Sequence, residues 1–324
     1  MDALSDVLQA VRLSGAVFFD IHASQPWVAE TPPGKAIVEG MFPGSEHLIS
    51  YHVITRGDCW ASVPGEPPMR LSAGDIIVLP HGDTHVLSST PGLRRSPDMS
   101  LYRLPKDGQL PMSISMGGPQ GDNNGEPAHF VCGFLACDAR PYNPLLTALP
   151  RVIRVSDNAG ALASYVQLAM AESKERRIGG ARVLRLLSEL MFVDVVRRYL
   201  ETLPADRADW LAGLRDPFVG RALAALHRSP ACNWTIESLA REAALSRSAL
   251  AERFTQFVGR PPMQYLTNWR MQLAANHLRS GAESVAAIAN RVGYESEAAF
   301  SRAFKKAVGT PPSEWRKSRN ENGE

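Results

Sequence analysis

Apolar residues recur at helical spacing twice within residues 235–315. In the first copy, Ile236, Leu239 and Ala240 fall three and four residues apart, as on one face of a short amphipathic helix. Leu250 and Phe254 mark the inner face of a second helix in the same way. The pattern returns 49 to 50 residues later, with apolar positions at Val285, Ile288, Ala289, Phe300 and Phe304. Each copy therefore predicts one helix-turn-helix unit, and the chain contains two.

Helix-start and turn residues fall where these units require them. Thr235 precedes the first helix of the first copy, and Ser246 and Ser296 precede the two second helices, as N-cap residues do. A tight turn is expected near Ala244 in the first copy, and Gly293 supplies the turn residue in the second. The positions of the helix-start and turn residues thus agree with the apolar pattern.

The first 150 residues have a different pattern, with short apolar runs between many glycines and prolines. Such runs are typical of β-strands bounded by turns. Residues 92–126 lack periodicity, and we expect a loop there that either covers one end of the β-structure or is a surface insertion. Strands are expected at residues 37–41, 47–55, 59–63, 76–79 and 129–135.

Two helices are expected between these regions, at residues 161–176 and 180–201. The second carries a broad apolar stripe that includes Val183 and Leu190. The stripe is wide enough both to pack on the β-structure and to meet a twin helix in a two-fold dimer. Asp194 falls within the stripe, so its carboxylate needs a hydrogen-bonding or basic partner if that turn is buried.

Charge is distributed unevenly along the chain. Residues 218–324 contain 15 Lys and Arg against 9 Asp and Glu, while the remainder contains 20 against 24. The formal net charge of +2 thus conceals a basic C-terminal third. A basic region with two helix-turn-helix units favours binding to DNA over a helical repeat that binds proteins. With 44% hydrophobic residues, the 324-residue chain can form two cores.

Three segments of the C-terminal region closely resemble the DNA-binding domain of AraC/XylS-type transcription regulators. They are CNWTIESLA at 232–240, RPPMQYLTNWR at 260–270, and IANRVGYESEAAFSRAF at 288–304 followed by GTPPSEWR at 309–316. The resemblance implies two helix-turn-helix units joined by a long helix over about residues 262–278. It also implies two visits to the major groove on one face of the duplex, about one helical turn apart.

By match to that family, the residues that read bases lie on the outer face of each unit's second helix. They are Arg247, Ser248, Ala251 and Glu252 in the first unit, and Glu297, Ala298, Ser301 and Arg302 in the second. Arginine can make forked contacts to guanine and glutamate can accept from cytosine, whereas alanine offers only a methyl contact. Either glutamate is equally readily explained as a solvated or salt-bridged surface residue. Phosphate contacts, which position the protein without specifying sequence, are expected from Arg270, Lys305, Lys306 and Arg316.

A second motif, GDIIVLPHGDTH, occupies residues 74–85. Its apolar strand ends at Pro80, turns at Gly82 and returns His85 inward, and this spacing resembles the second signature motif of cupin barrels. The first cupin motif is degraded, since a full metal site would show two histidines and a glutamate and only His52 sits suitably before a turn. The resemblance implies a cupin-like β-barrel used as a sensor.

His52, His85 and Cys132 are expected on neighbouring strands, directed into the barrel. Two imidazoles and a thiolate suit zinc or a similar divalent metal, although the same residues also occur as packed, hydrogen-bonded core residues. Redox sensing is the third possibility, with Cys59 and Cys132 as the best-placed pair. Cys132 and Cys137 are five residues apart, so they point to opposite faces of one strand.

The chain has four cysteines and neither a signal peptide nor a long apolar segment. We therefore expect a cytoplasmic protein with reduced thiols and no membrane partner. As a whole, the N-terminal part looks like the cupin sensor of one subgroup of AraC-type regulators, which includes a reactive-chlorine-responsive activator whose cysteines respond to oxidants. This resemblance makes a thiol or metal switch plausible.

These features predict an α+β multidomain protein. Residues 1–150 form a cupin-like sensor domain, residues 151–210 a helical linker and dimerisation segment, and residues 216–318 an all-α DNA-binding domain. The expected function is sequence-specific regulation of transcription, as an activator, by a homodimer that binds double-stranded promoter DNA, RNA polymerase and an unknown effector. The alternative is a cupin metalloenzyme, an isomerase or dioxygenase, with an accessory DNA-binding domain. That alternative needs a fuller metal shell than the chain offers.

Overall fold

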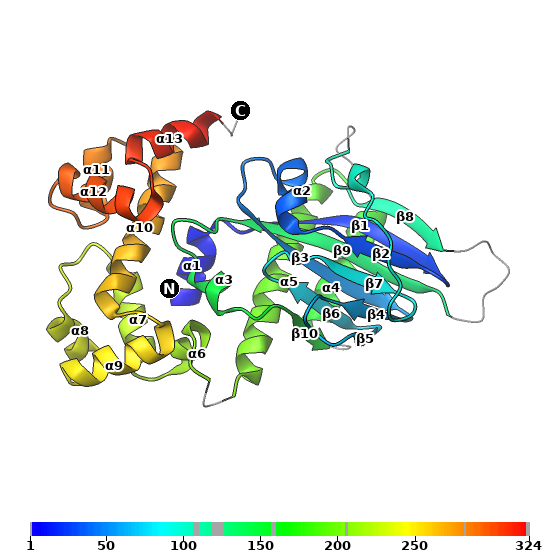
Figure 1. The fold of residues 1–324 in the computed structure, drawn as a ribbon, viewed down its shortest axis with the longest axis horizontal. Coiled ribbons are helices and arrows are strands. Elements are labelled where there is room, and N and C mark those ends of the chain that lie inside the picture. The colour runs from blue at the N-terminus through cyan, green and yellow to red at the C-terminus, as the bar shows by residue number, and fades with distance from the viewer. Residues whose placement is uncertain are drawn as a thin grey trace. The chain divides into compact units, whose positions relative to one another are not determined.

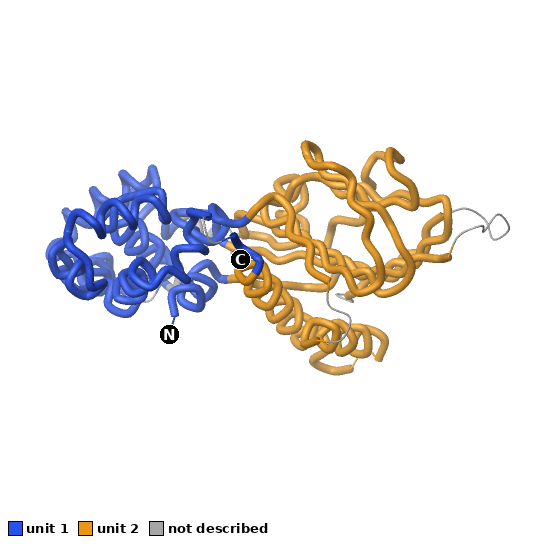
Figure 2. The backbone as a smooth tube through the Cα atoms, turned by 90° about the horizontal axis from the view of Figure 1, so that it is seen from below, with its two compact units in different colours: residues 1–12, 138–149, 202–324 blue, residues 13–137, 150–201 orange. Residues whose placement is uncertain are grey.

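Contacts divide the chain into two compact units, drawn in blue and orange in Figure 2. Unit 1 consists of Met1–Arg12, Asp138–Leu149 and Thr202–Glu324, and unit 2 of Leu13–Cys137 and Pro150–Glu201. In the part of the chain that is described, no helix is long and apolar enough to cross a membrane. The computed structural model describes residues 2–105, 110–117, 126–156, 160–175, 177–204, 207–281 and 283–321.

Unit 2 is built on two sheets with a common core (Figure 1). The larger sheet has the strand order β10-β6-β3-β9-β1-β8 and the smaller one β2-β7-β4-β5. Phe19 and Phe130 of the larger sheet and Cys59 and Leu87 of the smaller one belong to one buried cluster, so the inner faces of the two sheets enclose it. The strands are β1 (Ser14–Ser24), β2 (Val28–Thr31), β3 (His47–Arg56), β4 (Asp58–Ser62), β5 (Met69–Ser72), β6 (Asp75–Leu79), β7 (His85–Ser88), β8 (Met112–Gly117), β9 (Ala128–Cys137) and β10 (Ile153–Ser156).

Four of the five expected strands occur in place, as β3, β4, β6 and β9. The strand expected at residues 37–41 is wrong, because this segment belongs to helix α2 (Gly34–Met41). Ile37 and Met41 lie four residues apart and are both buried, while Glu39 and Gly40 between them are exposed. That is helical spacing, which a run of five residues is too short to reveal.

The loop expected over residues 92–126 contains ordered structure. A 3-10 turn spans Met99–Leu101, and β8 pairs in parallel with β1. In β8 the apolar side chains of Met112, Ile114 and Met116 are half-buried and alternate with exposed residues, which is the period of a strand. Residues 106–109 and 118–125 lie outside the described residues, as does part of the loop expected there.

Helices α4 (Ala161–Glu175) and α5 (Gly180–Thr202) pack on the outer face of the larger sheet. Leu184 and Leu187 of α5 form a cluster there with Val17 and Val131. The expected need of Asp194 for a partner is met by Arg198 one turn later, whose Nε lies 3.1 Å from its carboxylate. One face of α5 thus belongs to the core of unit 2.

Unit 1 is all-helical and centres on the long helix α10 (Pro262–Ser280). Tyr265, Trp269 and Leu278 on α10 are fully buried, with Phe254 on one side and Phe304 on the other. The other helices are α1 (Ala3–Ala10), α3 (Pro144–Ala148), α6 (Trp210–Arg215), α7 (Val219–Arg228), α8 (Ile236–Glu242), α9 (Arg247–Val258), α11 (Val285–Arg291), α12 (Glu297–Val308) and α13 (Pro312–Glu321).

Two segments of the expected sensor domain group with unit 1. The amide of Gln272 on α10 is buried and donates to the Ala10 carbonyl of α1 at 3.2 Å, while its oxygen accepts from the Tyr142 N–H at 3.0 Å. Asn276, one turn later, donates to the same Ala10 carbonyl at 2.6 Å. The contacts therefore cut across the linear division at residue 150, because residues 1–12 and 138–149 fold against the helices of unit 1.

Candidate functional sites

The first helix-turn-helix unit consists of α8 and α9. Thr235 caps α8 in a capping box with Ser238, and the Ser246 side chain accepts from the Ala249 N–H at the start of α9. The turn between them passes through Ala244, which has a positive φ of 55°. Leu250 on α9 is buried, as expected. These local signals fix the start of each helix and therefore which side chains of α9 face outward.

The second unit, α11 and α12, repeats this construction. Ser296 accepts from the Ala299 N–H at the start of α12, and Gly293 supplies the turn with φ of 84°. A Cβ on Gly293 would lie 2.7 Å from the carbonyl oxygen of Ala231, so this turn requires glycine for both its conformation and its close contact. Both expected turns are thus confirmed.

The expected base-reading residues form the outer faces of α9 and α12. Arg247, Ser248 and Glu252 are exposed on α9 with Ala251 half-buried beside them, and Glu297, Ala298 and Arg302 are exposed on α12 with Ser301 half-buried. Lys305 and Lys306 continue the exposed face of α12. The Arg247 guanidinium donates to the Glu237 carboxylate at 2.8 Å, an exposed ion pair that costs little to break. Each helix therefore presents a different set of hydrogen-bonding groups.

Arg270 has a structural place that the sequence did not reveal. Its guanidinium donates to the carbonyls of Pro230 at 2.7 Å, Cys232 at 2.9 Å and Gly293 at 3.3 Å. It joins the segment before the first unit to the turn of the second. Its donors are therefore engaged with backbone oxygens in the absence of DNA. Arg316 similarly donates to the Glu283 carbonyl at 2.7 Å.

In unit 2, His52, His85 and Cys132 lie together in the core, as the sequence predicted. They come from β3, β7 and β9, and His52 is paired with Cys132 across β3 and β9. The Cys132 Sγ lies 2.6 Å from Nδ1 of His52, and Nε2 of His52 lies 2.6 Å from Nε2 of His85. All three side chains are at most 4% exposed.

The contacts define one consistent order of protons. Nδ1 of His85 lies 2.9 Å from the Asp83 carbonyl and must donate to it, which leaves Nε2 of His85 as an acceptor. His52 therefore donates from Nε2, and its Nδ1 accepts from the thiol of Cys132. Burial lowers the pKa of His52 well below its usual value and that of His85 to about 4, and burial raises the pKa of Cys132. The result is a neutral hydrogen-bonded chain, here called the Cys132 relay.

The Cys132 relay does not fit a metal ion as it stands. A metal needs one donor atom from each residue at a common point. His52 instead directs one ring nitrogen at Cys132 and the other at His85. Among the described residues, the only group of three metal-type donors within mutual reach is Asp20, His22 and His129, a different site.

A cavity of about 300 Å³ opens beside the relay. His52 and Cys132 form part of its wall, and most of the remaining lining is apolar or aromatic, including Phe19 and Tyr102. Thr31 and the polar side chains of Glu30, Arg95 and Asp98 also line it. The cavity therefore places a space of small-molecule size beside His52 and Cys132.

Cys59 shares the core cluster with Cys132. Burial raises the pKa of Cys59 to about 12 and also raises the pKa of Cys132. Cys137 is also buried but lies outside that cluster, in agreement with the expectation that it faces the other side of β9. None of the four cysteines forms a disulfide, and all four lie within the described residues.

A two-sheet barrel with a buried relay, together with two helix-turn-helix units joined by one long helix, defines the class of DNA-binding transcription regulators. A cupin family model matches residues 2–201, through the end of α5, and a helix-turn-helix domain model matches residues 239–318. The chain belongs to the AraC family of transcription regulators with an N-terminal cupin domain. It is therefore a regulator and not an enzyme.

Full-length relatives share this organisation. An AraC-like transcription regulator of Streptomyces lividans is 33% identical over 98% of this chain and 98% of its own length. The HTH-type transcriptional regulator AlkR of Acinetobacter baylyi is 28% identical over 98% of this chain and 99% of its own. The RCS-specific HTH-type transcriptional activator RclR of Escherichia coli is 26% identical over 98% of this chain and 97% of its own.

Proposed function

We propose that this regulator activates transcription when a signal, best supported as an oxidant, reaches Cys132 in the cupin domain. The observation that carries the proposal is the contact of Cys132 Sγ with Nδ1 of His52 at 2.6 Å on the wall of a cavity. The family assignment supports DNA as the target of the output. The relay supports chemistry at sulfur as the input.

On DNA, α9 and α12 each enter a major groove with unequal reading faces. Arg247 and Arg302 donate to guanine, Glu252 and Glu297 accept from cytosine or remain solvated, and Lys305 binds phosphate. Because the two faces differ, each subunit reads two unlike half-sites in a fixed order. Each subunit's footprint on the operator is therefore expected to be asymmetric and directional.

Binding of the full-length chain to promoter DNA tests this reading. Arg302→Ala should weaken binding by about 1–3 kcal/mol and relax sequence preference at one position, since it removes a base contact. Lys305→Ala should weaken binding to all sequences alike. It should also make the dependence of log affinity on log salt concentration less steep by about one phosphate contact. Arg70→Ala, an exposed residue of the sensor's smaller sheet, serves as the control. Binding that is independent of salt, or Arg302→Ala equal to wild type on all sequences, contradicts the reading.

The relay supplies the chemistry for oxidation at Cys132. Burial raises the pKa of Cys132, so the resting sulfur is a neutral thiol, and Nδ1 of His52 is placed to accept its proton as the sulfur reacts. A two-electron oxidant then forms a bond to sulfur while its leaving group departs with the electron pair, which gives a sulfenic acid or an equivalent adduct. Cys59, the other thiol of this buried core cluster, is the candidate to condense with this product, with loss of water, to a disulfide. The oxidised relay loses its thiol donor, so the barrel core must rearrange.

Cysteine variants in a reconstituted transcription assay test the sensing role. With purified chain, promoter DNA and RNA polymerase, oxidant should raise transcript yield for wild type and leave Cys132→Ser unresponsive. Cys137→Ser, a buried cysteine on the opposite face of the same strand, should respond like wild type. An undiminished response of Cys132→Ser removes the sensing role, and a fall in transcript with oxidant replaces activation by repression. Peptide mapping should find the oxidised sulfur at Cys132.

We infer that the regulator acts as a homodimer formed through α5. Three large apolar residues of α5, Val183, Leu186 and Leu190, are 41–47% exposed and lie three and four residues apart on one stripe. This stripe lies beside the face formed by Leu184, Leu187 and Met191, which packs within unit 2. A twin helix would bury the exposed stripe, and the arrangement suits the two-fold symmetry of most dimers.

A further inference from the structure

We propose that Asp20, His22 and His129 form a binding site for a divalent metal ion of the zinc class on the outer face of the larger sheet. This site is separate from the Cys132 relay, which lies on the inner face. Its residues, on β1 and β9, take no part in the proposed oxidation of Cys132.

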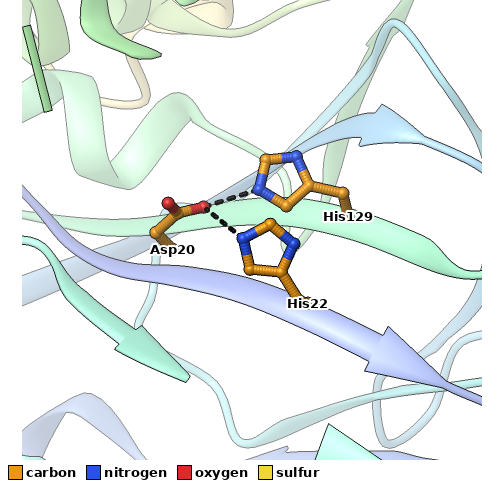
Figure 3. A group of neighbouring side chains, drawn as sticks. All are labelled: Asp20, His22 and His129. Atoms are coloured by element: carbon orange, nitrogen blue, oxygen red, sulfur yellow. Dashed lines mark hydrogen bonds and ion pairs between the residues drawn. The ribbon is translucent and has the colours of Figure 1, made fainter. Parts of the chain in front are cut away.

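Strand alternation places the three side chains together. Phe19 and Ile21 of β1 point into the barrel core, so Asp20 and His22 between and beside them point outward. His22 is paired directly with His129 of β9. Figure 3 shows the carboxylate of Asp20 facing both imidazoles, with the two rings side by side. The three residues thus converge from adjacent strands of a rigid sheet rather than from loops.

The distances are those of a site that an ion can close. Nε2 of His129 lies 2.6 Å from Oδ1 of Asp20, and Nε2 of His22 lies 4.0 Å from the same oxygen. All three donor atoms lie within 4.8 Å of one another. Tetrahedral zinc with bonds of about 2.0–2.1 Å holds its donor atoms about 3.3 Å apart. Shifts of the donor atoms by a few tenths of an ångström to about 1 Å would therefore bring them to coordinating positions.

A hydrogen bond behind His129 fixes the ring for metal binding. The Thr55 hydroxyl donates to the His129 carbonyl at 2.9 Å, so at 2.5 Å it accepts from Nδ1–H of the ring. Nε2 donates to the Asp20 carboxylate at 2.6 Å, so a metal ion bound at Nε2 would replace this proton while Nδ1–H stays on Thr55. Metal-binding histidines are commonly held by such a bond from the other ring nitrogen.

The donor set and its exposure select the class of ion. Two imidazoles and one carboxylate favour zinc, nickel, cobalt or copper over magnesium or calcium. The side chains of Asp20, His22 and His129 are 23%, 58% and 16% exposed, which leaves an ion access from solvent and a free position for water. Bound metal would cross-link β1 to β9, the strand that carries Cys132.

Metal titration of the full-length chain tests the proposal. Protein stripped of metal by a chelator should bind zinc, which calorimetry measures. It should also bind cobalt, and its absorption spectrum should lack the sulfur-to-metal band that a Cys132 ligand would produce. His22→Asn and His129→Asn should each bind one equivalent of metal less than wild type, or bind it at least tenfold more weakly. Thr55→Val should lose about 10–100-fold, as removal of a supporting hydrogen bond does. Ser113→Ala, opposite Asp20 on β8 and exposed on the same face, should bind like wild type.

Two results would overturn the proposal. One is wild-type protein that binds no zinc or cobalt, which leaves the cluster as a His–Asp ion pair. The other is binding that His22→Asn and His129→Asn leave unchanged, which places the ion elsewhere. His22 is largely exposed, so its variant should fold, and circular dichroism of every variant checks this. A response of DNA binding to zinc is not needed for either outcome.

Discussion

At the scale of single residues, buried histidines carry two different roles in this protein. His52 and His85 complete a relay with a thiol on the wall of a cavity. His227 in unit 1 is equally buried, but its Nε2 accepts from the Tyr265 hydroxyl at 2.7 Å, and that hydroxyl accepts from Nε1–H of Trp210 at 3.0 Å. His227 is therefore a packing residue of the DNA-binding unit. Residue type did not distinguish the two roles, whereas the neighbouring groups do.

His227 predicts a pH dependence of stability. Burial lowers the pKa of His227 to about 3, whereas an unfolded histidine titrates near pH 6.5. Between these values the unfolded chain binds more protons, so the stability is fully present above about pH 6.5 and falls as the pH is lowered toward 3. The expected loss from His227 is about 2 kcal/mol between pH 7 and pH 5. Urea unfolding of unit 1 at several pH values should show this loss for wild type and not for His227→Gln. The same change of unfolding free energy with pH in the two proteins would contradict the lowered pKa of His227.

At the scale of elements, one stretch of sequence can serve two surfaces. The apolar stripe of α5 was expected to be broad enough for both the barrel and a partner helix. The structure divides it: Leu184 and Leu187 are buried, while Leu186 and Leu190 remain exposed beside them. The periodicity established the helix and its width, but which edge of the stripe met the sheet depended on the position of Val17 and Val131.

The exposed edge of α5 predicts the basis of dimerisation. Leu186→Glu combined with Leu190→Glu should convert the protein from dimer to monomer, because a dimer interface would have to bury two unpaired carboxylates. Arg185→Ala, an exposed residue of the same helix, should remain dimeric. Sedimentation velocity measures the masses. A wild-type monomer, or a double variant that stays dimeric with normal circular dichroism, would show that α5 is not the interface.

At the scale of the whole molecule, the chain enters unit 1 three times. The strands β1 and β9 are neighbours in the sheet, and the residues next to them, Arg12 and Asp138, already belong to unit 1. Asp138 is 1% exposed and binds the guanidinium of Arg279 on α10, while Nε of Arg12 lies 3.3 Å from the same carboxylate. A change at Cys132 on β9 is therefore connected through five residues of backbone to an ion pair on the central helix of the DNA-binding unit.

This arrangement predicts unequal effects of two substitutions on unit 1. Asp138→Asn should lower the free energy of unfolding by about 3–5 kcal/mol, because it leaves the buried guanidinium of Arg279 without its counter-charge. Arg12→Ala should cost at most about 1 kcal/mol, since the Arg12 side chain is half exposed. Thermal or urea unfolding measures both. Similar small losses would mean that Asp138 does not anchor this junction.

Local signals were sufficient for the DNA-binding helices. Ser246, Ser296 and Gly293 set helix starts and turns through contacts within a few residues, so the helix-turn-helix units and their outer faces followed from the chain itself. The same holds for β3 and β9 as strands, whose long apolar runs predicted them, whereas the pairing of His52 with Cys132 joins strands 80 residues apart. Regular periodicity and short-range hydrogen bonds are encoded in neighbouring residues, and these features needed no knowledge of the fold.

Other features depended on residues far apart in the sequence. Arg270 binds carbonyls 23 to 40 residues away, which the sequence did not indicate, and Asp20 and His129 meet across 109 residues. The grouping of residues 1–12 and 138–149 with unit 1 likewise follows from packing on α10. Strand pairing and helix packing bring such groups together, and neither leaves a periodic signal near the residues concerned. The outer face of α12 could therefore be predicted from the sequence alone. The proton order of the Cys132 relay and the meeting of Asp20 with the two histidines were decided by the tertiary structure.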